Sequence, residues 1–157
     1  MTNRDLLLLQ IEICDKNQKR LSDALLLLEP LFPITPQKLD VLETQQLGLL
    51  DMMTGRFAKL QDGIGRKVFP VILEILQEDV EGDTFIDRLN RLEKLGVLDS
   101  VEEWDILRDI RNSITHDYPG HPEYLAEALN QCWKKSHDLI SLWLKIKDYI
   151  TRKVLDA

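Results

Sequence analysis

The segment from Arg111 to Tyr118 carries the side chains with the widest chemical repertoire in this sequence. It reads R-N-S-I-T-H-D-Y, so a guanidinium (Arg111), an amide (Asn112), an imidazole (His116) and a phenol (Tyr118) follow one another closely. A histidine can take up or release a proton near neutral pH. An arginine holds phosphate oxygens through paired hydrogen bonds and keeps its charge. These properties suit the cleavage of RNA without a metal ion.

Each of these groups has a candidate role in such a reaction. His116 would remove the proton of the ribose 2′-hydroxyl or protonate the leaving oxygen. Arg111 would stabilise the charge that develops on the phosphate, and Asn112 would orient His116 or bind phosphate. No cluster of His, Cys, Asp and Glu has the spacing of a metal site, so we expect no metal or other cofactor.

A purely structural role for these residues is the alternative. Arg111 could pair with a nearby carboxylate, and His116 could cap the last carbonyls of a helix. On an ideal helix Arg111 and His116 lie about 140° apart. Both border one cleft only if the cleft is broad, the helix end unwinds or a second subunit closes it. Tyr118 precedes Pro119, which disfavours helical geometry, so we expect Tyr118 to leave the helix beside His116.

Composition favours an all-α protein. The chain has 157 residues, which indicates one domain over residues 1–157, and it is rich in Leu but has only 7 Gly, 6 Pro and 6% aromatic residues. No stretch alternates apolar and polar residues as a strand would. Helical periodicity with short turns predicts an up-and-down bundle of about five helices.

Capping residues and prolines set the expected helix boundaries. The first helix begins at Thr2 or Asn3 and ends near residue 29, before a connector that contains three prolines. Further helices are expected at residues 37–62, 64–76 (a third helix or a kinked continuation), 84–95 and 123–154. Residues 63–67 (G-I-G-R-K) lack the spacing of a phosphate-binding loop and follow no strand, so we interpret their glycines as helix punctuation.

The helix that carries the segment 111–118 begins at Ser100, where S-V-E-E fits a capping box. Its apolar face is expected to hold Trp104, with Arg111 at the edge of that face. Asn112 and His116, four residues apart, should share the polar side. The remaining members of the two faces are Leu107, Ile110 and Ile114 on the apolar side, and Asp105, Arg108 and Asp109 on the polar side.

Charge, cysteines and hydropathy exclude several classes of protein. A net charge of −7 argues against a general nucleic-acid coat, although a local RNA site remains compatible with it. Cys14 and Cys132 are far apart, which favours two buried thiols in a reducing compartment over a zinc knuckle or disulfide framework. With neither a secretory signal nor an apolar stretch of about 20 residues, we expect a cytoplasmic protein without a membrane partner. Four basic residues form either a strip that contacts the RNA backbone or a face that is simply exposed to solvent: Arg56, Lys59, Arg66 and Lys67.

The pattern R-x-x-x-x-H-x-Y near the end of a helix, in a small acidic all-helical protein, resembles the HEPN superfamily. It is most similar to HepT-type toxins, which are paired with minimal nucleotidyltransferase (MntA-type) antitoxins. Arg111, His116 and Tyr118 match the Arg, His and Tyr of that motif, and Asn112 matches the polar residue that often follows the Arg. Outside the motif, only helix pattern and size correspond.

The resemblance implies a HEPN-like bundle that forms a homodimer, in which the motif helices of two subunits build one ribonuclease site. It implies metal-independent cleavage of an RNA substrate (tRNA or mRNA). It also implies that an MntA-like antitoxin transfers AMP from ATP to Tyr118, with Mg²⁺ bound by the antitoxin. An AMP group would add negative charge and bulk at the cleft and repel RNA. A non-catalytic, nucleotidyltransferase-binding helical module is the alternative function.

Overall fold

The computed structural model describes residues 1–116 and 118–156. Helix α1 (Asn3–Leu28) begins at Thr2, which exchanges two capping hydrogen bonds with Asp5, of 3.0 and 3.1 Å. Helix α5 (Phe85–Leu95) begins at Thr84 with the same reciprocal pair, and helix α6 (Val101–Ser113) begins at Ser100, whose hydroxyl accepts from the Glu103 N–H. The helix starts expected from these capping residues are therefore confirmed.

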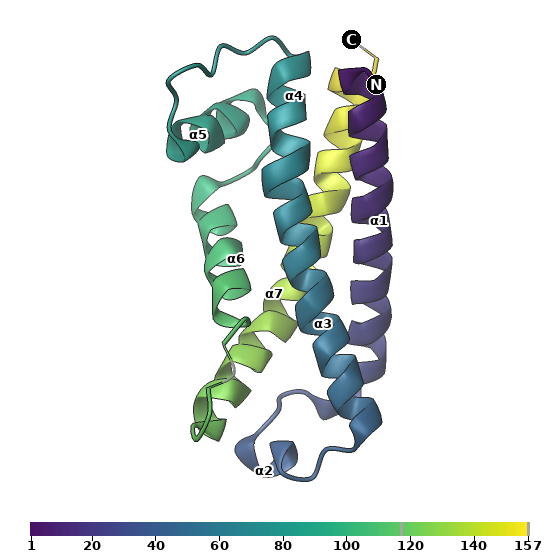
Figure 1. The fold of residues 1–157 in the computed structure, drawn as a ribbon, viewed down its shortest axis with the longest axis vertical. Helices are drawn as coiled ribbons and strands as arrows, with labels where there is room; N and C mark the ends of the chain where they lie inside the picture. Colours follow the sequence, from purple (N-terminus) through teal and green to yellow (C-terminus); the bar gives the residue numbers. More distant parts are fainter. Residues whose placement is uncertain (117, 157) are drawn as a thin grey trace.

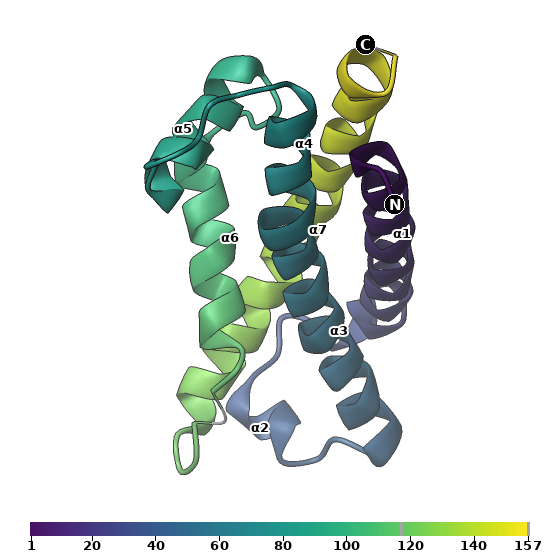
Figure 2. The same cartoon turned by 45° about the horizontal axis from the view of Figure 1, so that its top comes forward.

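The long helices run up and down (Figures 1 and 2). Helix α1 descends from the N-terminus, α3 (Thr44–Gly63) and α4 (Phe69–Ile75) ascend, α6 descends, and α7 (Pro122–Tyr149) returns to the end where both termini lie. The single-turn helix α2 (Pro36–Leu39) lies at the opposite end, and a 3-10 turn, η1 (Glu29–Leu31), ends α1. The described residues form no strand, so the all-α, up-and-down bundle is confirmed.

The helix expected over residues 37–62 is wrong at its start. Helix α2 ends at Leu39, and α3 begins only at Thr44. Glu43 and Gln46 explain the break, because the Glu43 N–H donates to Gln46 Oε1 at 2.9 Å in a capping arrangement. This local hydrogen bonding starts a new helix, although Leu39, Leu42 and Gln46 keep a helical spacing across the gap.

Residues 64–76 continue the rod that α3 begins, one of the two alternatives expected for them. A π-helical turn, η2 (Ile64–Val68), connects α3 to α4, and the Phe69 N–H donates to the Ile64 carbonyl five residues earlier. In a regular helix the Pro70 ring would clash with the carbonyl four residues back. The wider π turn relieves that clash and keeps the chain helical. A second π turn, η3 (Ile150–Val154), ends α7.

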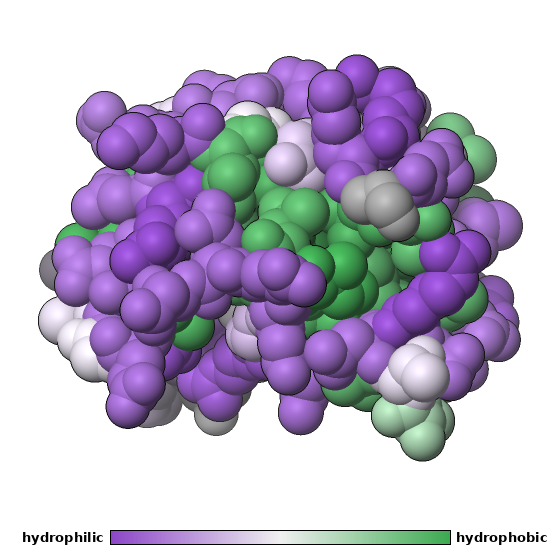
Figure 3. All heavy atoms as spheres, turned by 90° about the horizontal axis from the view of Figure 1, so that it is seen from above, coloured by the Kyte–Doolittle hydropathy of each residue, from purple (hydrophilic) through white to green (hydrophobic). Residues whose placement is uncertain are grey.

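Large side chains fill the core between the helices. Trp104, Trp143 and Phe57 are fully buried, as are many leucines and isoleucines of α1, α3 and α7. Viewed from the end that carries both termini, apolar residues form a continuous surface area bordered by polar residues (Figure 3). Among the described residues, no helix combines the length and apolar content required to cross a bilayer.

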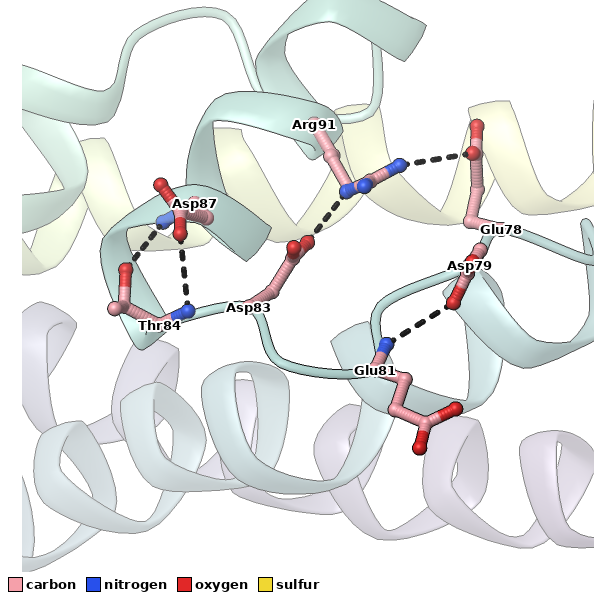
Figure 4. Close-up of polar contacts among 7 residues, drawn as sticks. All are labelled: Glu78, Asp79, Glu81, Asp83, Thr84, Asp87 and Arg91. Carbon is pink, nitrogen blue, oxygen red and sulfur yellow. Dashed lines mark hydrogen bonds and ion pairs between the residues drawn. The ribbon is translucent and has the colours of Figure 1, made fainter.

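The loop between α4 and α5 is held by charged contacts (Figure 4). Arg91 extends from α5 to Asp83 and Glu78, and Asp79 accepts a hydrogen bond from the Glu81 N–H at 3.2 Å. These contacts fix where α5 begins. They thereby place Phe85, its first residue, beside α6, where Arg108 lies 5.6 Å from the Phe85 ring centroid.

Gly65 allows α6 to approach η2 closely. A Cβ atom at this position would lie 2.8 Å from Cζ2 of the buried Trp104, whereas nothing lies within 4 Å of a Cβ at Gly55, an exposed residue of α3. We expect Gly65→Ala to destabilise the protein by about 1–3 kcal/mol through overpacking. Gly55→Ala should stabilise it by about 0.5–1 kcal/mol through helix propensity. Urea unfolding followed by circular dichroism measures both, and equal effects at the two positions would contradict this packing.

Candidate functional site

A pocket of about 400 Å³ lies between the α3–η2 rod and α6. One side of the rod and one side of α6 form most of its wall, because residues three, four or seven apart share one side of a helix. Asp62, Gly65 and Arg66 come from the rod. Trp104, Arg108 and Arg111 come from α6, and Gln61, Phe85 and Asn112 complete the lining. We call this space the arginine pocket.

Arg111 is the most enclosed cation of the arginine pocket. Its Nη2 donates to Asp62 Oδ2 at 2.7 Å, and its Nη1 donates to Asn112 Oδ1 at 3.3 Å. The side chains of Arg111 and Asp62 are only 28% and 33% exposed, so solvent screens this pair less than it screens a surface pair. The carboxylate partner considered for Arg111 from the sequence is therefore present, and it comes from a different helix.

The other two arginines face the same space more openly. Arg66 lies 3.8 Å from Asp62 with its side chain 75% exposed, and Arg108 lies 3.2 Å from Asp105 with its side chain 38% exposed. Arg108 was expected on the polar side of α6 with Asp105 and Asn112, and it pairs with Asp105 and lines the pocket beside Asn112. It also lies four residues after Trp104, which lines the same pocket.

Two buried donors in the lining residues have no hydrogen-bond partner within residues 1–116 and 118–156. They are the indole Nε1 of Trp104 and the Nε of Arg111. A buried N–H without an acceptor is costly. Both donors belong to side chains that line the arginine pocket.

Helix α6 ends before His116. The hydroxyls of Ser113 and Thr115 donate to the carbonyls of Ile110 and Asn112, at 2.9 and 2.7 Å, and the His116 N–H donates to the Ser113 carbonyl. The expected stacking of Asn112 and His116 on one helical side is therefore wrong, because α6 stops at Ser113. The His116 side chain is exposed. The helix end is unwound, one of the three geometries considered from the sequence, but His116 does not line the same pocket as Arg111.

Tyr118 lies outside α6 and beside His116, as Pro119 predicts. The two rings are 5.9 Å apart in an edge-to-face arrangement. The backbone of Tyr118 has a φ of +49°, which is uncommon for a residue with a side chain. Its hydroxyl donates to the Ser113 carbonyl at 3.2 Å, and the ring lines a second, partly apolar pocket between α6 and α7.

The structure thus separates the predicted site residues into two groups. Arg111 and Asn112 line the arginine pocket, whereas His116 and Tyr118 pack together beyond the end of α6. The arginine pocket also contains residues that were not assigned to the site from the sequence. The signal for them was present, since Trp104, Arg108 and Arg111 follow helical spacing. What the sequence does not reveal is that Asp62 and Arg66 lie opposite.

The remaining candidate residues have other environments. Arg56 donates to Asn17 across α1 and α3 at 2.9 Å, while Lys59 and Lys67 are exposed. Burial raises the pKa of the Cys14 and Cys132 thiols to about 12, so both stay protonated at neutral pH and are poor nucleophiles. Within the described residues, no group of three or more His, Cys, Asp or Glu side chains is arranged to hold a metal ion.

The Arg111–Asp62 pair should contribute measurably to stability. A double-mutant cycle with Asp62→Asn and Arg111→Gln, measured by urea unfolding, should give a coupling energy of about 0.5–2 kcal/mol. Lys19 and Asp23 form a matched control on α1, with side chains 69% and 36% exposed, and should give at most about 0.5 kcal/mol. If the two cycles give the same coupling, the pair at Arg111 is not formed in solution.

Compared with protein-family models, with curated proteins and with solved structures, the chain gives no match.

Proposed function

We propose that this protein is a metal-independent endoribonuclease toxin of the HEPN type, with Arg111, His116 and Asn112 as its catalytic residues. The observation that carries the proposal is the end of α6. There Arg111 holds its guanidinium at an arginine-lined pocket, and His116 follows just beyond the helix with an exposed imidazole. A phosphate-binding cation and an accessible proton-transfer group are thus offered by one short segment.

The proposed reaction is a transesterification. The ribose 2′-hydroxyl loses its proton, its oxygen attacks the adjacent phosphorus, and the bond from phosphorus to the 5′-oxygen breaks. The 5′-oxygen takes up a proton, which leaves a 2′,3′-cyclic phosphate and a 5′-hydroxyl. His116 handles one of the two protons, and Arg111 stabilises the charge on the non-bridging oxygens. Asn112, in contact with Arg111, positions that guanidinium.

We further propose a homodimer in which the site is shared. Within one chain, Arg111 lines the arginine pocket whereas His116 packs on Tyr118 outside it. A second subunit is therefore the simplest source of a histidine for the pocket that contains Arg111. The pocket between α6 and α7 beside Tyr118 offers an apolar surface for this contact, since Ile106 and Tyr124 are 39% and 53% exposed there. Two-fold dimers are also the commonest oligomers.

The proposed control of the toxin is AMP transfer to Tyr118 by a partner nucleotidyltransferase of the MntA type. The phenol oxygen would attack the α-phosphorus of ATP, pyrophosphate would leave, and the phenolic proton would pass to the partner enzyme or to water. Since Tyr118 packs against His116, a bound AMP would place its negative charge and bulk next to the catalytic imidazole.

Cleavage should depend on His116 and Arg111. Without the partner, the purified protein should cut tRNA or mRNA in the presence of EDTA. His116→Ala and Arg111→Ala should each slow cleavage by at least about a hundredfold, because a proton-transfer group or a charge-stabilising donor is lost. His137→Ala is the matched control, as His137 is an exposed histidine of α7. Folded His116→Ala that cuts as fast as the parent would refute the assignment.

The same two variants test whether the site is shared. A mixed dimer of Arg111→Ala and His116→Ala chains contains one site with both groups, if each site takes Arg from one chain and His from the other. Co-refolding equal amounts should then restore about a quarter of the parental rate, because half of the dimers are mixed and half of their sites are complete. If the mixture remains inactive, either both catalytic residues of a site come from the same chain or the protein does not form the proposed dimer.

AMP transfer should require Tyr118. After incubation with the cognate nucleotidyltransferase, ATP and Mg²⁺, the intact mass should rise by whole AMP units and cleavage should fall. Tyr118→Phe should abolish the mass increase and remain an active nuclease, whereas Tyr124→Phe, which changes a neighbouring exposed tyrosine, should still be modified. Modification that persists in Tyr118→Phe would show that the acceptor is another residue.

A further inference from the structure

We propose that the arginine pocket is a binding subsite for one nucleotide, held through its phosphate by Arg66, Arg108 and Arg111 and through its base by Phe85. That this nucleotide is part of an RNA strand rests on the proposed function. The recognition of a nucleoside phosphate follows from the pocket itself.

Charge selects an anion in the arginine pocket. Three arginines and one aspartate line it, although the whole chain carries a net charge of −7. Arginines hold phosphate oxygens through paired, charge-assisted hydrogen bonds. A cleft with an excess of positive charge also concentrates anionic ligands. The volume of about 400 Å³ exceeds what a single phosphate needs and lies within the range of small-molecule sites.

Aromatic residues of the pocket provide a surface for a base. Phe85 is 44% exposed although it is a large apolar residue, and the Arg108 guanidinium lies over its ring, 5.6 Å from the centroid. Exposed aromatic rings and arginine planes are the groups on which unpaired bases stack, with little dependence on sequence. A planar base attached to the bound phosphate would therefore cover Phe85.

Two side chains that line the arginine pocket carry a buried donor without a partner in the part of the chain that the structure describes. Trp104 is completely buried, and neither its indole Nε1 nor the Nε of Arg111 has an acceptor among the described residues. An anion in the pocket offers acceptors to such donors directly or through ordered water. The Nε and one Nη of an arginine form the edge that binds two phosphate oxygens together.

Asp62 would compete with the ligand. Its carboxylate holds Arg111 at 2.7 Å and lies 3.8 Å from Arg66, so in the free protein it partly neutralises the two cations that a phosphate would use. A bound phosphate must share these guanidinium groups with Asp62 or displace it. Removal of this carboxylate charge should therefore strengthen anion binding.

Calorimetric titration of the intact protein tests the proposal, with AMP, adenosine, inorganic phosphate and a 2′-O-methyl RNA tetranucleotide, which lacks the attacking hydroxyl, as probes. AMP and the tetranucleotide should bind and compete with each other, and AMP should bind at least about tenfold more tightly than adenosine. Arg66→Gln and Arg108→Gln should each weaken AMP binding about tenfold or more, and Asp62→Asn should strengthen it. Phe85→Leu should weaken AMP binding but not phosphate binding.

Arg20→Gln, an exposed arginine of α1 outside the pocket, is the matched control and should bind AMP as the parent does. Competition by the tetranucleotide identifies an RNA strand as a source of the nucleotide, and binding of AMP alone identifies a free nucleotide. Absence of binding by both probes, or equal weakening by Arg20→Gln and Arg66→Gln, would overturn the proposal. A protein that binds AMP but cuts no RNA would refute the nuclease and leave this subsite in place.

Discussion

The contact between the Trp104 indole and Gly65 determines how α6 lies against the rest of the bundle. The indole is completely buried, and a Cβ atom at position 65 would lie only 2.8 Å from it. Helix α6 can therefore pack this closely on the α3–α4 rod only because residue 65 has no side chain. Arg66, which follows Gly65 on the rod, and Arg108, one turn after Trp104 on α6, line the same pocket as a result of this approach. The arginine pocket is a direct result of the packing.

Electrostatics then sets what this pocket can accept. Three guanidinium groups in a confined space repel one another, and the carboxylate of Asp62, a residue of α3, offsets part of that repulsion. Arg111 is anchored by that carboxylate at 2.7 Å and needs no ligand to remain in place. The site is therefore organised before any anion arrives, which lowers the entropic cost of binding.

Local rules account for most of the fold, and the failures have local explanations as well. Thr2, Thr84 and Ser100 start helices because their side chains satisfy free N–H groups, and the sequence shows such residues directly. The break before Thr44 was missed since no proline or glycine marks it. In the site, His116 was placed on a helix that ends at Ser113, because the hydroxyls of Ser113 and Thr115 compete for its last carbonyls. The pairing of Arg111 with Asp62 joins residues 49 positions apart, and no helical periodicity predicts such a contact.

The π turn η2 changes which side of the α3–α4 rod carries the inward-facing residues. Each residue of a regular helix advances the chain by about 100°, and a π turn contains one residue more than an α turn. Before the turn, Asp62 faces α6 and the pocket, and after it Ile72 and Leu73 are buried in the core. If one residue were deleted from this turn, α4 would be rotated by about 100° relative to α3. Such a variant could keep either the arginine pocket or the packing of α4 in the core, but not both.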